Sequence, residues 1–177
     1  MNNLKIDHIE KNPFSRPAEK LQSVKAIIVH YTACPKASAK NIRDYFDNLK
    51  KQSKPDTARS ASAHYAVDDD NIIEIIPPDE VAYHVGAKQI QYTELSRSLG
   101  NRSPNNYTIG IEMCHDDESG KISVKTLANT IVLIQELNQK FGLTSENIFR
   151  HFDITGKNCP KWFVENANDW NEFKGMI

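Results

Sequence analysis

Residues 24–30, VKAIIVH, decide the fold class of this chain. Successive side chains of a β-strand point to opposite faces, and here apolar side chains occupy both faces. That pattern is typical of a central strand that other elements cover on both sides. His30 then stands at the C-terminal end of the predicted strand.

Strands and helices are mixed along the rest of the chain. Residues 62–67 and 71–76 flank an acidic turn, which is typical of a β-hairpin. The predicted strands are 24–30, 62–67, 71–76, 108–114 and 147–150, and the predicted helices begin after Ser38 and cover 124–140 and 162–173. In the helix at 124–140 the apolar stripe consists of Val124, Leu127, Ile131, Ile134 and Leu137. We therefore expect an α/β fold, a single domain with a central mixed β-sheet flanked by helices.

Two segments lack a periodic pattern. Residues 1–22 are polar and contain Pro13 and Pro17, so we expect an N-terminal arm packed on a domain of residues 23–177. Residues 86–106 show neither helical nor strand spacing. We expect them to form a long surface loop, and loops of that length are usually functional.

Composition and charge exclude several classes of protein. The 177 residues include 22 Lys and Arg against 23 Asp and Glu, a net charge of −1. This balance argues against a nucleic-acid or anionic membrane partner. The first 17 residues contain no apolar core of about 7–15 residues, so they do not form a secretory signal. We expect a monomer that is synthesised in the cytoplasm without a signal peptide.

The segment HFDITGKNCP, residues 151–160, contains the most suggestive chemistry. Seven residues separate His151 from Cys159, His30 ends one strand, and Glu112 lies on the polar face of another. Two imidazoles and one thiolate can bind Zn²⁺ and leave its fourth position open to water. A loop histidine and a half-buried structural thiol fit the same spacing, which arises often by chance.

Motifs in a fixed order favour the metal site over this structural interpretation. They are VHYTA (29–33), SAHYAVD (62–68), AYHVG (82–86), TIGIEMC (108–114) and RHFDITGKNCP (150–160). Together they resemble the zinc-dependent N-acetylmuramoyl-L-alanine amidases of the type 2 amidase family, whose fold is shared with peptidoglycan recognition proteins. The resemblance extends from about residue 24 to residue 162 and implies that residues 23–177 form a zinc amidase catalytic domain.

The resemblance also implies roles for individual residues. His30, His151 and Cys159 correspond to the ligands of one Zn²⁺ per chain. Glu112 corresponds to a glutamate that acts as the general base, and Lys157 to a lysine that stabilises the oxyanion. Some relatives use a tyrosine before the hairpin histidine, but Ala63 stands there in this chain. The chain is therefore similar to the glutamate subtype.

The implied substrate is peptidoglycan, cleaved between the lactyl group of N-acetylmuramic acid and the L-alanine of the stem peptide. His64 and His84 are candidate substrate-binding residues. Without a signal peptide, we expect a phage or prophage endolysin, or a bacterial autolysin, that acts on the cell wall after its release.

Two alternatives stay open. A binding module of the same fold would hold peptidoglycan without cutting it, and loss of a ligand residue such as Cys159 is its expected mark. A Cys–His hydrolase would instead use Cys159 as nucleophile and His151 as base. A chelator separates the second alternative from a zinc amidase, because a thiol nucleophile needs no metal.

Overall fold

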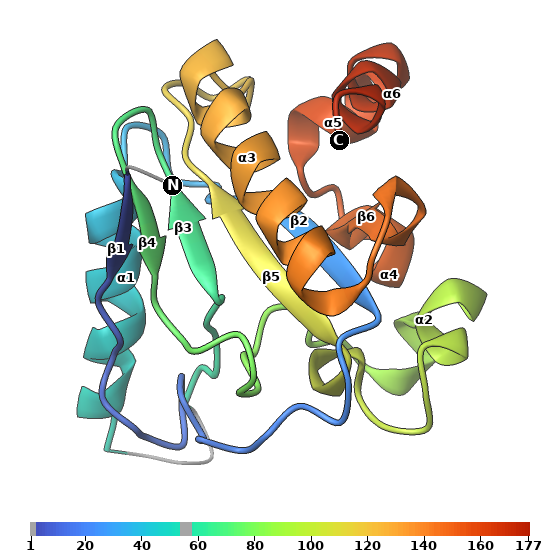
Figure 1. Ribbon diagram of the computed structural model, residues 1–177. Coiled ribbons are helices and arrows are strands. Elements are labelled where there is room, and N and C mark those ends of the chain that lie inside the picture. The colour runs from blue at the N-terminus through green and yellow to red at the C-terminus, as the bar shows by residue number, and fades with distance from the viewer. Residues whose placement is uncertain (1–2, 54–57) are drawn as a thin grey trace.

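A computed structural model describes residues 3–53 and 58–177, so residues 1–2 of the predicted arm and 54–57 of the predicted domain lie outside the described residues. Its centre is a six-stranded mixed sheet in the order β1-β4-β3-β5-β2-β6, with helices on both faces (Figure 1). The strands are β1 (Leu4–Ile6), β2 (Ala26–Tyr31), β3 (Tyr65–Val67), β4 (Ile72–Glu74), β5 (Thr108–Met113) and β6 (Ile148–Arg150). The helices are α1 (Ala39–Asn48), α2 (Glu94–Ser98), α3 (Val124–Phe141), α4 (His151–Thr155), α5 (Lys161–Glu165) and α6 (Ala167–Gly175). The prediction of an α/β fold with a mixed sheet is confirmed.

The predicted strand at 24–30 is the inner strand β2. It pairs in parallel with β5 on one side and with β6 on the other. Its residues from Ala26 to His30 are all buried, as the apolar pattern on both faces requires. The pairing places His30 directly opposite Glu112 of β5. Residues in register on parallel strands point to the same face, so these two side chains share one face of the sheet.

Helix α3 covers the other face of the sheet and crosses in front of it in Figure 1. Ser123 caps its first turn, and Gly142, in the left-handed conformation at φ 68°, ends it. Its buried residues are Thr126, Thr130, Leu133, Ile134 and Leu137. The expectation that Val124 belongs to the buried stripe is wrong, because its side chain is 84% exposed. Val124 precedes Thr126 by two residues, roughly 200° around the helix, and so faces away from the sheet.

The C-terminal helix predicted at 162–173 is two helices. The backbone leaves the helical conformation at Asn166, with φ −128° and ψ 82°, between α5 and α6. The Asn166 side chain donates a hydrogen bond to the carbonyl of Trp162 and so satisfies the end of α5. Apolar spacing continues across this break, which is why the sequence pattern reads as one helix.

The expectation of an unstructured loop at residues 86–106 is wrong in part. The segment contains 3₁₀ turns at Gln89–Gln91 and Pro104–Asn106, and helix α2 between them. The Thr93 side chain caps α2, and Leu99 is buried in a cluster with Val85 and Ile154. Helix α2 has five residues, too few for an apolar period to show in the sequence.

The N-terminal arm contributes the edge strand β1, which pairs in parallel with β4. The predicted division into an arm of residues 1–22 and a domain of residues 23–177 stays a prediction. Residues 4–6 nevertheless belong to the sheet of that domain.

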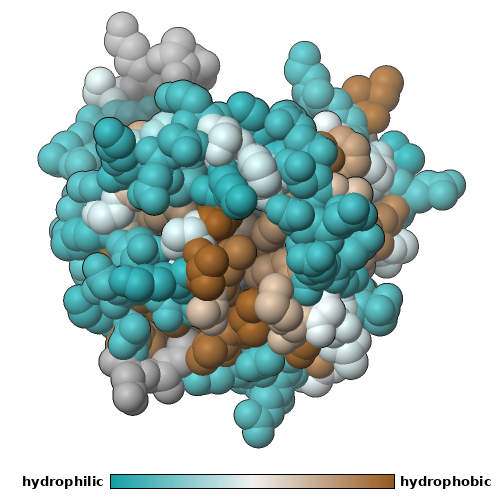
Figure 2. All heavy atoms as spheres, turned by 90° about the horizontal axis from the view of Figure 1, so that it is seen from above, coloured by the Kyte–Doolittle hydropathy of each residue, from teal (hydrophilic) through white to brown (hydrophobic). Residues whose placement is uncertain are grey.

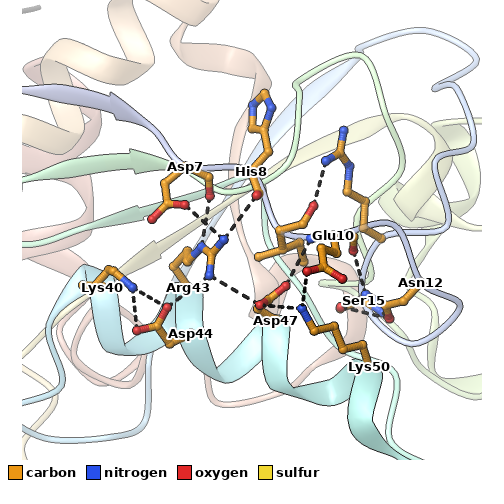
Figure 3. A network of polar contacts seen from close by, with 12 residues as sticks. Asp7, His8, Glu10, Asn12, Ser15, Lys40, Arg43, Asp44, Asp47 and Lys50 are labelled. Atoms are coloured by element: carbon orange, nitrogen blue, oxygen red, sulfur yellow. Dashed lines mark hydrogen bonds and ion pairs between the residues drawn. The ribbon is translucent and has the colours of Figure 1, made fainter.

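Ion pairs fasten the arm to α1, as Figure 3 shows. The Arg43 guanidinium lies 3.0 Å from Asp7 Oδ1, donates to the carbonyl of His8, and pairs with two carboxylates on its own helix. We call these contacts the arm network; its members are Asp7, His8, Glu10, Lys40, Arg43, Asp44, Asp47 and Lys50.

The C-terminal ends of the central strands lie toward the upper side of the molecule in Figure 1. Figure 2 views that side from above: most of it is hydrophilic, and hydrophobic side chains gather near its middle. Among the described helices, none has both the length and the apolar character needed to cross a membrane.

Candidate metal centre

The structure brings together the three residues whose types suggested a metal. His30 lies near the end of β2, His151 is the first residue of α4, and Cys159 lies in the loop before α5. Their ligand atoms are all within 4.8 Å of one another, and all three residues are buried. Cys159 Sγ is 3.8 Å from His30 Nδ1, and the two imidazole rings are 4.7 Å apart between centroids. This cluster could hold a metal ion.

Local folding explains how residues so distant in sequence meet. In the β2–β6 pair Val29 lies opposite Arg150, so His151 begins α4 beside His30. Gly156, at φ 76°, ends α4 in the left-handed conformation that glycine adopts readily. The chain then turns back, and the Phe152 N–H donates to the carbonyl of Cys159 over 2.9 Å. The helix and the returning loop therefore present their donors to the same point.

Burial keeps this cluster uncharged at neutral pH. Burial lowers the pKa of His30 well below its ordinary value and that of His151 to about 4. It raises the pKa of the Cys159 thiol to about 12. The imidazoles therefore carry free lone pairs and no positive charge, which is the form that binds metals.

Two buried polar atoms in the described part of the chain point to the same conclusion. His151 Nδ1 and Glu112 Oε2 are shielded from solvent and have no hydrogen-bond partner. A buried polar atom without a partner costs about 1–3 kcal/mol. A cation bound by the cluster, together with a water molecule, would satisfy both atoms. The residues present thus fit a metal centre.

Glu112 and Lys157 adjoin the cluster in one cavity of about 200 Å³, which His30, His151 and Cys159 also line. Glu112 is half-buried, and burial raises the pKa of its carboxyl group to about 8, against the opposing charge of Lys157. Lys157 is exposed. A carboxyl group with a pKa near neutrality and a cation therefore face the same small space as the metal donors.

The two histidines expected at the substrate lie deeper than the prediction implies. His64 is fully buried: its Nε2 donates to the carbonyl of Glu80, and its Nδ1 accepts from the Gly110 N–H. Both ring nitrogens are thus engaged with the backbone, an arrangement that gives substrate binding by His64 no support. His84 lines the cavity and is 8% exposed, and its Nδ1 lies 3.1 Å from His30 Nε2.

Further residues that were not predicted from the sequence also line this cavity, among them Tyr45, Arg59 and Tyr83. The Arg59 guanidinium lies over the Tyr45 ring, 5.9 Å from its centroid. Tyr45 is 40% exposed on α1. The sequence offers one signal for Tyr45, which is an aromatic residue beside the buried stripe of an amphipathic helix. The same pattern is equally typical of a core residue.

Comparisons with known proteins agree with this geometry. A family model described as N-acetylmuramoyl-L-alanine amidase matches residues 20–162. The amidase CwlL of Bacillus licheniformis is 37% identical over 169 residues, and BlyA of Bacillus subtilis is 40% identical over 177 residues. Each alignment covers 96% of this chain and 45% of the relative, so the chain spans about half the length of the curated relatives it matches.

Among solved structures, the catalytic domain of XlyA superposes with a TM-score of 0.72 at 28% identity. The alignment covers 99% of both chains. The two chains therefore share the same fold. Because the family model also spans β2, β5 and the whole donor cluster, the chain belongs to the N-acetylmuramoyl-L-alanine amidase family.

Proposed function

We propose that this chain is a zinc-dependent hydrolase of peptidoglycan. It cleaves the amide bond between the lactyl group of N-acetylmuramic acid and the L-alanine of the stem peptide. The observation that carries the proposal is the cluster of His30, His151 and Cys159 with Glu112 in the same cavity. The names of the relatives CwlL and BlyA describe the same reaction.

His30, His151 and Cys159 would hold the zinc ion. Two imidazole nitrogens and a thiolate leave a fourth tetrahedral position for water, which is the composition of catalytic zinc sites. The soft thiolate favours Zn²⁺ over Mg²⁺ or Ca²⁺, which prefer oxygen ligands. When bound, zinc would lower the pKa of water towards about 7 and polarise the carbonyl of the scissile amide.

Glu112 acts as the general base and then as the general acid. Its carboxylate takes the proton of the attacking water and delivers it to the nitrogen of the leaving L-alanine. Such proton transfer contributes typically about 10²–10⁴-fold to the rate and works best when the pKa lies near the working pH. The raised pKa of about 8 fits both directions of transfer.

Lys157 stabilises the negative charge that develops on the carbonyl oxygen. Its ammonium group is carried by an exposed side chain that lines the cavity. A cation placed where charge develops is worth more in the transition state than in the ground state. Lys157 therefore favours the reaction rather than substrate binding alone.

We propose further that the protein is a monomeric endolysin or autolysin that is made in the cytoplasm and reaches the cell wall after its release. Its near-neutral charge supports neither a nucleic-acid nor a membrane partner. A binding module of the same fold is the alternative. The complete donor set and the adjoining Glu112 favour catalysis over binding alone.

Zinc content and amine release test the proposal together. The purified chain is analysed by mass spectrometry for zinc, and the new amino groups released from peptidoglycan are counted before and after chelation. We expect one zinc per chain, and amine release that a chelator stops and added Zn²⁺ restores. Zinc without amine release would indicate the binding module. Cleavage that resists the chelator would indicate a hydrolase with Cys159 as nucleophile.

A further inference from the structure

His84 contacts His30 on the side of the ring away from Cys159. His30 Nε2 lies 3.1 Å from His84 Nδ1, while His30 Nδ1 is the nitrogen that faces Cys159 Sγ. A contact between two imidazole nitrogens is a hydrogen bond only if one carries a proton and the other does not. The direction of this bond therefore decides which nitrogen of His30 is free for a metal.

The partners of Thr108 fix the proton on His84. The Thr108 hydroxyl donates to the carbonyl of Pro104 over 2.9 Å, because a carbonyl oxygen only accepts. With its one hydrogen so engaged, Thr108 Oγ1 accepts at 3.0 Å from His84 Nε2. The Thr108 carbonyl, 3.3 Å from the same nitrogen, also accepts only. His84 Nε2 must therefore carry a proton.

The proton on His30 follows. The His84 ring is buried, and the side chains that contact His84, those of His30, His64, Asn105 and Thr108, carry no negative charge that would stabilise an imidazolium. The ring is therefore neutral, and its Nδ1 has a free lone pair. That lone pair accepts the hydrogen of His30 Nε2. A neutral imidazole carries one proton. Because the proton of the buried His30 ring lies on Nε2, its Nδ1 is left bare, 3.8 Å from Cys159 Sγ.

The sheet is shaped to hold His84 in this place. Thr108, Gly110 and Glu112 alternate along one face of β5. A Cβ atom on Gly110 would lie 2.5 Å from His84 Cγ, so only glycine leaves room for the ring. Asn105 fixes the backbone, because its Oδ1 accepts from the N–H groups of His84 and Val85 at 3.1 and 3.0 Å.

We infer that His84 is a positioning residue for the metal centre: held by Thr108 against Gly110, it selects the tautomer of His30 that presents Nδ1 to the metal. The inference rests on the proposed zinc site but goes beyond the ligand set. Metal-binding histidines usually donate their second N–H to an acceptor that fixes the ring, and loss of that acceptor typically costs about 10–100-fold in metal affinity. Here the acceptor is a neutral imidazole rather than the usual carboxylate or carbonyl.

Zinc affinity tests the inference through three variants of the purified chain. His84→Leu removes the acceptor, and we expect zinc to bind about 10–100-fold more weakly in competition with a chromogenic chelator. His84→Asn keeps an acceptor oxygen near the position of Nδ1, so it should recover most of the affinity. Thr108→Val should lose less than His84→Leu, because the Thr108 carbonyl remains as a partner. Wild-type affinity in His84→Leu, or equal losses in His84→Leu and His84→Asn, would overturn the inference.

A second measurement needs no variant and no metal. Long-range ¹H–¹⁵N spectra of the metal-free chain report which nitrogen of each histidine carries the proton. We expect the Nε2–H form for both His30 and His84, and an Nδ1–H form of either would overturn the inference. If the wild type binds zinc as expected and does not cleave peptidoglycan, the proposed function fails while the inference stands. If the wild type binds no zinc, both fail.

Discussion

The arm network and the candidate metal cluster of His30, His151 and Cys159 place ionisable side chains in different surroundings. The side chains of the network lie near the surface, and those of the metal cluster are buried. In the arm network, Arg43 and Lys50 bridge carboxylates of the arm and of α1 near the surface (Figure 3). In the metal cluster, His30, Cys159 and Glu112 meet in a cavity at the ends of β2 and β5. Every charge that we describe in the network has an opposite charge beside it. The cavity of the cluster is lined instead by two cations, Arg59 and Lys157, and by the carboxyl group of Glu112.

The pKa shifts record this difference. The hydrogen bond from Lys40 lowers the pKa of Asp44, so its carboxylate stays charged. In and beside the metal cluster, burial raises the pKa values of Glu112 and Cys159 and lowers that of His30. The two acids therefore stay protonated and the imidazole stays neutral. Exposed ion pairs typically contribute about 0–1 kcal/mol each. Buried groups without partners cost stability, and clusters of them mark functional sites. The network thus fastens the chain, and the cluster is arranged for a ligand.

Removing a donor from the cluster should have the largest effect. Cys159→Ser replaces the thiolate by a hydroxyl, a poor ligand for zinc. We expect zinc affinity to fall by more than about 100-fold, beyond the loss typical of an outer partner, and turnover to disappear. Chelator competition measures the affinity. Cys34→Ser, at an exposed thiol, is the matched control and should change neither property; stoichiometric zinc in Cys159→Ser would refute this ligand set.

Replacing the proposed base, Glu112, while keeping all three metal donors should separate chemistry from metal binding. Glu112→Gln keeps the shape of the side chain but cannot accept the proton of water. We expect the zinc content to be unchanged and kcat to fall by about 10²–10⁴-fold. Glu118→Gln, at an exposed carboxylate in the loop after β5, should behave as wild type. Near-normal kcat in Glu112→Gln would exclude Glu112 as the base.

Acid should destabilise the folded chain through its buried histidines. The ion pairs of the arm network should stay intact to lower pH. Burial lowers the pKa of His64 from 6.5 to about 4. The unfolded chain therefore binds more protons than the folded chain in this window, and the free energy of unfolding falls as the pH drops from about 6.5 to about 4. One histidine contributes a slope of up to about 1.4 kcal/mol per pH unit.

Urea unfolding at a series of pH values measures this slope. His64→Gln should be less stable at pH 7 but should lose less stability than the wild type between pH 6.5 and pH 4. An unchanged slope in the variant would show that His64 does not titrate in this window.

The smallest effect should come from the network. Lys40 pairs with Asp44 one helical turn away, and both side chains are largely exposed. Lys40→Ala should cost about 0.3–0.5 kcal/mol in the free energy of unfolding, measured in urea at low salt. The loss should vanish at about 1 M NaCl, where the Debye length is about 3 Å. A cost above about 1 kcal/mol that persists in salt would contradict the comparison.

Much of the fold could be predicted because it depends on local pattern: the apolar residues of VKAIIVH identify an inner strand. The donor set of His30, His151 and Cys159 was expected from the resemblance of the ordered motifs to the amidase family, because the spacing of these residues alone arises often by chance. The roles of Thr108, Gly110 and His84 could not be predicted, because they depend on how β5 lies beneath the loop that carries His84. The break at Asn166 and the exposure of Val124 were missed for a related reason: apolar spacing does not report where a helix bends or which side meets the sheet.

The most direct test of the account is the position of zinc in a crystal of the zinc-loaded chain, located by anomalous diffraction at the zinc edge. The account predicts one peak, at about 2.0–2.1 Å from a nitrogen of His30 and of His151 and at about 2.3 Å from Cys159 Sγ, with Nδ1 as the ligand atom of His30. A peak held by other residues, or no peak at a concentration that supports cleavage of peptidoglycan, would contradict it.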